Sequence, residues 1–211
     1  MPFTVGQFFD VFARYNTALG PWVVLAYAAG IAVVACVWRG GEVSSRWIAA
    51  MLALLWTFVG VVYHSVFFAP INPAAWLFAL LFIAQGALLA EAAVSEGDWT
   101  FERRGWPAAL GVAAMAYALI VYPLLGLALG HGYPRSPLFG VAPCPLTIFT
   151  LGVLMVARHA PRRLFVVPIA WSGIGGSAAW LLDVPEDFGL IAAGLLTVAV
   201  LLARRPDPRV A

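Results

Sequence analysis

Apolar residues along this chain fall into seven long runs, separated by short segments that hold most of the charged residues. The runs cover residues 21–37, 47–69, 74–94, 106–130, 145–157, 164–182 and 188–203. A helix that crosses the hydrocarbon core of a bilayer needs about 20 predominantly apolar residues. The pattern therefore predicts an all-α membrane protein with seven transmembrane helices, forming a single domain over residues 1–211.

The distribution of arginine predicts how these helices are oriented. All twelve basic residues are arginine, and ten of them lie in the gaps after the first, third, fifth and seventh runs: Arg39, Arg46, Arg103, Arg104, Arg158, Arg162, Arg163, Arg204, Arg205 and Arg209. The opposite side holds only Arg14 and Arg135. Because basic residues mark the cytoplasmic side of a membrane protein, we expect the N-terminus outside and the C-terminus in the cytoplasm.

A separate helix is predicted over residues 3–16, before the first apolar run. Thr4 and Gln7 fit a capping box, and Phe3 and Phe8 fit the hydrophobic staple that accompanies it. Aromatic residues then recur at helical spacing, at Phe8, Phe12 and Tyr15. This pattern is typical of an amphipathic helix in the membrane interface. The same pattern would also suit a helix packed over the outer mouth of the bundle.

Composition narrows the class of partner. The chain is 63% hydrophobic and 10% charged, whereas a typical soluble domain has about 25% charged residues. Its net charge of +2 comes from the predicted cytoplasmic loops and indicates membrane insertion, not nucleic-acid binding. The expected partners are the lipid bilayer and a small solute or ion. The sequence also leaves open whether the protein forms a homo-oligomer.

A weak internal similarity relates the two ends of the chain. A constant shift of 112 residues aligns Arg46 with Arg158 and Pro73 with Pro185. This favours a parallel 3+1+3 repeat, an arrangement found in several transporter folds. Apolar sequences with proline in their turns also align by chance, so both explanations stay open.

Polar residues within the predicted spans gather toward the outer side, which predicts a cavity open to the outside. The candidate ligand-binding residues are His64, Tyr63, Asn72, Tyr122, Trp171 and Cys144. An ionisable residue inside a span is costly and usually marks a site or pathway, so His64 is the leading candidate for a proton-binding or ligand-binding group. The alternative is a structural histidine hydrogen-bonded to a neighbouring helix. Trp171, beside a glycine-rich segment of the sixth run, is a candidate moving element.

Cys144 lies between two prolines at the start of the fifth run. A thiol at a helix N-terminus can be reactive, but we favour the simpler interpretation of a small apolar side chain packed at the capped entrance of a helix. His64, His131 and Cys144 are also candidate ligands for copper or zinc, but no metal-binding spacing connects them. No cofactor is predicted. The absence of lysine excludes a retinal Schiff base.

Three carboxylates lie in the turn between the sixth and seventh runs, at Asp183, Glu186 and Asp187. They could attract a cation to the mouth of the bundle. We favour the simpler interpretation, in which they are exposed acidic counterparts of the basic cytoplasmic loops.

Three stretches of the chain resemble a family of bacterial integral membrane proteins of unknown function. They are residues 2–9, residues 63–76 from Tyr63-His64 to Asn72-Pro73-Ala74-Ala75-Trp76, and residues 143–150 with Pro143-Cys144-Pro145. The resemblance implies a location in the bacterial cytoplasmic (inner) membrane and brings no activity with it.

Together these observations predict a multi-pass membrane protein whose outward-facing polar cavity binds a small solute or ion, for transport. Two alternatives remain. One is a metal-dependent or thiol-dependent redox protein or enzyme that uses Cys144 with His131 or His64. The other is an accessory or sensor subunit of a membrane complex.

Overall fold

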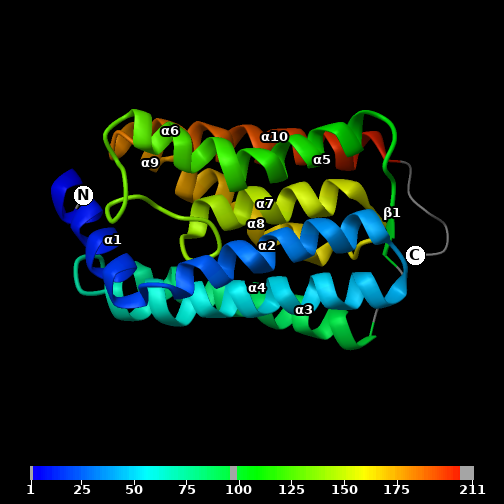
Figure 1. Cartoon of the computed structure of the whole chain (residues 1–211), viewed down its shortest axis with the longest axis horizontal. Helices are drawn as coiled ribbons and strands as arrows, with labels where there is room; N and C mark the ends of the chain where they lie inside the picture. The colour runs from blue at the N-terminus through cyan, green and yellow to red at the C-terminus, as the bar shows by residue number, and fades with distance from the viewer. Residues whose placement is uncertain (1, 96–98, 205–211) are drawn as a thin grey trace.

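The computed structural model describes residues 2–95 and 99–204, which form an elongated bundle of helices that run back and forth along one axis (Figure 1). The helices are α1 (Val5–Leu19), α2 (Trp22–Arg39), α3 (Glu42–Phe58), η1 (Val59–Phe68), α4 (Ala75–Ser95), α5 (Trp106–Ala116), η2 (Tyr117–Val121), α6 (Tyr122–Ala128), α7 (Pro143–Val156), α8 (Arg163–Gly176), α9 (Ala178–Leu181), η3 (Pro185–Asp187) and α10 (Phe188–Ala203). A two-stranded antiparallel pair, β1 (Thr100–Phe101) with β2 (Ala157–Arg158), is a small addition to the expected all-α fold.

Six of the seven predicted spans are confirmed as apolar helices long enough to cross a membrane. They are Trp22–Arg39, Glu42–Phe68, Ala75–Ser95, Trp106–Ala128, Arg163–Leu181 and Pro185–Ala203. Two of them continue through short π-helical segments, η1 and η2, which have no signal in the hydrophobic pattern.

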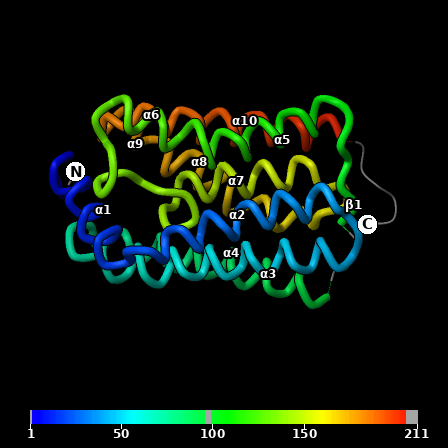
Figure 2. Tube along the Cα trace, viewed as in Figure 1, coloured from blue at the N-terminus to red at the C-terminus, as the bar shows by residue number. Residues whose placement is uncertain are grey.

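The remaining predicted span, the fifth apolar run, forms α7, the most enclosed helix among the described residues. All 14 of its residues are buried, and the other helices surround it along its length (Figures 1 and 2). At 1.5 Å per residue it is about 21 Å long, which is shorter than the ~30 Å hydrocarbon core. The segment of residues 129–142 precedes it, and buries Phe139, Val141 and Ala142 against the bundle.

The two ends of the bundle differ in charge. One end, called here the strand end, carries β1, β2 and the end of α10, where the Arg204 side chain donates to the Met155 carbonyl at 2.6 Å. Eight arginines of the described residues lie in the segments at this end: Arg39, Arg46, Arg103, Arg104, Arg158, Arg162, Arg163 and Arg204. Arg205 and Arg209, which the sequence assigned to the same side, lie outside the described residues.

The opposite end, called here the α1 end, is covered by α1 (Figure 1). The predicted capping box is present, with the Thr4 backbone N–H donating to Gln7 Oε1 and the Gln7 backbone N–H donating to Thr4 Oγ1. The Asn16 amide donates to the carbonyls of Pro134 and Ser136, at 2.7 and 2.8 Å. The helix is amphipathic as predicted, and its buried face packs over the mouth of the bundle.

The parallel 3+1+3 repeat stays a prediction. The two helix triplets are packed differently, because α7 contacts α10 as well as α8, whereas α2 packs mainly against α3.

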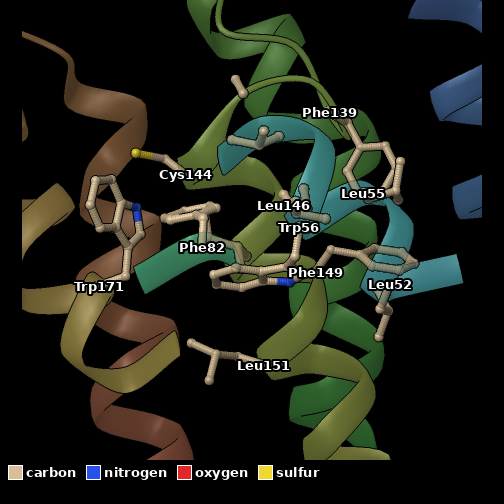
Figure 3. Close-up of a cluster of buried hydrophobic side chains, with 14 of the residues drawn as sticks. Leu52, Leu55, Trp56, Phe82, Phe139, Cys144, Leu146, Phe149, Leu151 and Trp171 are labelled. Carbon is tan, nitrogen blue, oxygen red and sulfur yellow. The ribbon is translucent and has the colours of Figure 1, made fainter. Parts of the chain in front are cut away.

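An aromatic and aliphatic core fills the centre of the bundle (Figure 3). Trp56 of α3 is fully buried and packs against Phe82, with ring centroids 4.3 Å apart. Its indole N–H donates to Thr150 Oγ1 of α7 at 2.9 Å. The partner that a buried indole needs therefore comes from the central helix.

Candidate functional site

A cavity of about 180 Å³ lies at the α1 end, bounded by α1, η1, the α8–α9 segment and the turn before α10. Its lining includes all six of the predicted ligand-binding residues: His64, Tyr63, Asn72, Tyr122, Trp171 and Cys144. They come from five separate segments, so only the tertiary structure could bring them together. Five are buried, and Asn72 is half-buried in the turn at the rim.

The walls of the cavity are mainly aromatic. Besides the predicted residues, its lining contains the rings of Phe3, Phe8, Phe12, Phe68 and Phe78. An apolar cavity with a few converging polar groups is the usual form of a small-molecule site.

The π-helical segment η1 supplies two of the polar residues. Its wider turn is closed by the Ala69 backbone N–H, which donates to the His64 carbonyl at 2.9 Å. Tyr63 and His64 follow each other in the chain, yet both are buried and both line the cavity. Single π turns inside α-helices occur frequently at functional sites.

His64 has no conventional structural role in the part of the chain that the structure describes. The side chain is 1% exposed, and neither ring nitrogen has a hydrogen-bond partner there. Its ring is surrounded by other rings, with centroids 4.8 Å from Phe82 and 5.3 Å from Trp171. A structural histidine bonded to a neighbouring helix is therefore not what the structure shows. Since burying an unsatisfied polar group is costly, the free nitrogens point to a ligand.

The interpretation of the acidic turn as an exposed charge cluster is wrong for two of its three residues. Asp183 is exposed, but Glu186 is 0% and Asp187 is 2% exposed. Val184 anchors the turn in the core and η3 then directs both carboxylates into the bundle. The sequence feature that could have indicated burial was the pair Val184 and Pro185 between the acidic residues. This pair alone does not show how deeply the turn lies in the bundle.

Asp187 is the one acidic residue among the described residues that line the cavity. Its Oδ1 accepts a 2.6 Å hydrogen bond from the Tyr122 hydroxyl, and the Cys144 thiol lines the same cavity. A buried carboxylate must be compensated by such a hydrogen bond to be tolerated. The sequence pattern indicated Tyr122 and Cys144 as site residues but not Asp187.

Cys144 is 8% exposed and its thiol points toward the ring of Trp171 (Figure 3). Reactive thiolates are stabilised by neighbouring positive charge or by a helix N-terminus. The helix N-terminus is present, but the residues described around the cavity include a carboxylate and no arginine. The arrangement favours a neutral thiol.

His131 lies outside the cavity lining, so the three proposed metal ligands do not converge. Its ring stacks on Phe9 at 4.1 Å, and its Nδ1 is 3.6 Å from Glu186 Oε1. Across residues 2–95 and 99–204, no group of three or more His, Cys, Asp and Glu side chains is arranged to hold a metal ion.

The predicted moving element is located beside the cavity. Helix α8 ends at Gly176 and α9 begins at Ala178, and Ser177 between them keeps α-helical backbone angles, so the sixth span continues through a local irregularity at a residue that lines the cavity. Gly175 is needed for close packing, since a Cβ there would lie 2.7 Å from the Trp171 indole nitrogen.

The chain matches a family of unknown function, DUF6064, over residues 5–211. It belongs to this family. The match covers every helix described above and agrees with the resemblance to an uncharacterised family. No curated protein and no solved structure matches the chain. The residues of the cavity therefore carry the functional argument for this DUF6064 protein.

Proposed function

We propose that this DUF6064 protein is a seven-helix protein of the bacterial cytoplasmic membrane that binds a small solute in the α1-end cavity and transports it. The observation that carries the proposal is the unpartnered His64 ring in the wall of a cavity that is also lined by the buried Asp187 carboxylate. Buried ionisable residues within membrane spans usually belong to substrate or ion pathways.

The proposed orientation of the protein in the membrane is inferred from the arginine residues at the strand end. A cytoplasmic strand end follows from the bias of basic residues toward the cytoplasm, and it puts α1 and the cavity mouth on the external side. The proposal counts seven spans because it adds α7 to the six longer apolar helices. Helix α7 would cross the bilayer centre inside a ring of lipid-facing helices. Its length of 14 residues is tolerable there because protein and the segment of residues 129–142 cover its ends.

Transport is supported by the glycine-rich sixth span. Spans interrupted by glycine or proline beside a binding site are common in transporters, where they allow one part of the bundle to move. Here α8 and α9 meet at Ser177, which lines the cavity, and Gly173 lies one turn earlier, where a Cβ would meet no heavy atom within 4 Å. We propose that Trp171 moves with this segment as the solute passes.

Binding and transport can be tested separately on the purified protein in mild detergent. A screen of small solutes for thermal stabilisation identifies ligands, since a ligand stabilises the state that binds it. Uptake of a hit into proteoliposomes then tests transport. Binding without uptake would replace the carrier with a receptor or sensor subunit.

His64→Ala is the decisive variant. We expect it to abolish binding and uptake while the protein still inserts into the membrane and remains monodisperse. His159→Ala, which removes a histidine at the strand end, is the matched control. Unchanged ligand affinity in His64→Ala would refute the assigned site.

The orientation has its own test. Reporter proteins that are active on only one side of the membrane, fused at each terminus, should place the C-terminus in the cytoplasm and the N-terminus outside. The opposite pattern would put the cavity on the cytoplasmic side.

A further inference from the structure

The charge of the cavity restricts its solute. Among the described residues that line it, Asp187 is the one carboxylate, and neither arginine nor lysine is present. An anionic solute would meet a buried negative charge with no positive partner, which is strongly unfavourable in a low-dielectric site. The electrostatics favour a cation.

The walls supply a second feature that suits a cation. The rings of Phe12 and Phe68 each lie nearly parallel to that of Tyr63, with centroids 5.0 and 5.7 Å from it, and all three line the cavity. On the other side, Trp171 meets Phe78 edge-on at 5.2 Å. Aromatic faces attract organic cations through their quadrupoles, and cages of such rings are a recurrent way to bind quaternary ammonium groups.

The size of the cavity excludes large cations. An engineered apolar cavity of about 150 Å³ holds benzene, so a cavity of about 180 Å³ has room for a solute of similar bulk. The free His64 nitrogens add one polar contact, since an imidazole can accept a hydrogen bond from an N–H or O–H group and can also donate one.

We infer that the solute is a small organic cation, an amine or quaternary ammonium compound with a compact apolar body, held by Asp187 and the aromatic walls. This inference rests on the proposed function, because it specifies the ligand of the same cavity. The carboxylate neutralises the ammonium group, the rings surround its apolar surface, and His64 contacts a polar substituent.

Matched ligand pairs test the inference by calorimetric titration of the purified protein. Choline is compared with its uncharged isostere 3,3-dimethylbutan-1-ol, and benzylamine with benzyl alcohol, while benzoate serves as the anion. We expect at least one cation to bind about tenfold or more tightly than its neutral partner, because its ammonium group pairs with the buried Asp187 carboxylate. Benzoate should not bind.

Asp187→Asn should remove this preference and bring each cation to within about twofold of its neutral partner, because the factor depends on the charge. Asp183→Asn is the control, since it removes an exposed acid from the same turn and should change nothing. Should Asp187→Asn fail to fold, Trp171→Leu is the second variant: it removes an aromatic wall of the cavity and should weaken the binding of each cation more than that of its neutral partner, and an unchanged ratio would overturn the inference.

The possible outcomes distinguish a failure of this inference from a failure of the proposed function. Equal binding of cations and neutral isosteres, or binding of benzoate, overturns the inference and leaves a solute-binding cavity. A cation preference that survives in Asp187→Asn also overturns it. If none of the five compounds binds and the broader solute screen finds no ligand, both the inference and the proposed function fail.

Discussion

The hydroxyl of Tyr122 donates a 2.6 Å hydrogen bond to Oδ1 of Asp187, which joins α6 to η3 in the lining of the cavity. Both side chains are almost completely buried. The bond satisfies a phenol and a carboxylate that would otherwise each be costly inside an apolar bundle. This part of the cavity lining is therefore a structural junction as well as a candidate binding site.

Tyr122→Phe should destabilise the protein by about 1–3 kcal/mol, because it leaves a buried carboxylate without this donor. Tyr117→Phe is the matched control, since the Tyr117 hydroxyl donates to a backbone carbonyl, that of Glu186, at 2.8 Å. Loss of that neutral bond should cost about 1 kcal/mol. Unfolding by denaturing detergent measures both free energies, and equal losses would contradict the role given to Tyr122.

Thr150→Val should cost about 1–3 kcal/mol, because it removes the acceptor of the buried Trp56 indole N–H and leaves that donor unsatisfied. Thr147→Val provides the comparison on the same helix. Thr147 is equally buried, but its hydroxyl bonds only within α7, to the Pro143 carbonyl at 2.8 Å. The thermal midpoint should fall clearly for the first variant and little for the second, and the reverse order would contradict the assigned bond.

Gly152→Ala should destabilise the contact between α5 and α7. A Cβ at this position would lie 2.7 Å from the Gly111 carbonyl oxygen, which is backbone and cannot move aside. Overpacking of this kind costs about 1–3 kcal/mol. Gly173→Ala meets no heavy atom within 4 Å and should be neutral or stabilising by up to about 1 kcal/mol, from helix propensity alone. Thermal unfolding in detergent distinguishes the two, and a tolerated Gly152→Ala would mean that the helices are less closely packed.

Tyr15→Phe should make the protein more resistant to alkaline pH. Burial of the Tyr15 hydroxyl raises its pKa above the usual value of 10. Below pH 10 the phenol is neutral in both states, whereas above it the unfolded chain ionises first and the native state loses stability. The variant lacks this loss, and it also removes a hydroxyl with no hydrogen-bond partner among the described residues.

The check is a series of thermal midpoints between neutral and alkaline pH. Tyr133→Phe, at an exposed tyrosine near the same end, is the control and should follow the wild-type curve. A Tyr15→Phe curve with the same alkaline slope as wild type would contradict the expectation.

The sequence largely predicted which residues lie at the same end of the bundle as the candidate site. It predicted less well how their side chains are arranged around the cavity. His64, Tyr63 and Tyr122 could be assigned to the outer side because the position of a residue along a span follows from its place in an apolar run. The same reasoning placed Asp187 and Glu186 at that end of the bundle but did not reveal that they are buried. A carboxylate in a turn is normally solvated, and only the packing of Val184 and η3 draws these two into the interior.

The sequence by itself determined the apolar helices, their approximate limits, the start of α1 and the uneven distribution of arginine. These features depend on runs of neighbouring residues or on contacts between residues three apart, such as Thr4 and Gln7. The tertiary structure alone decided that α7 is the enclosed helix, that His131 turns away from Cys144, and that Asp187 meets Tyr122. Those outcomes depend on how each helix is rotated and which neighbours it meets. Packing between segments far apart in the chain controls that choice, and no local pattern records it.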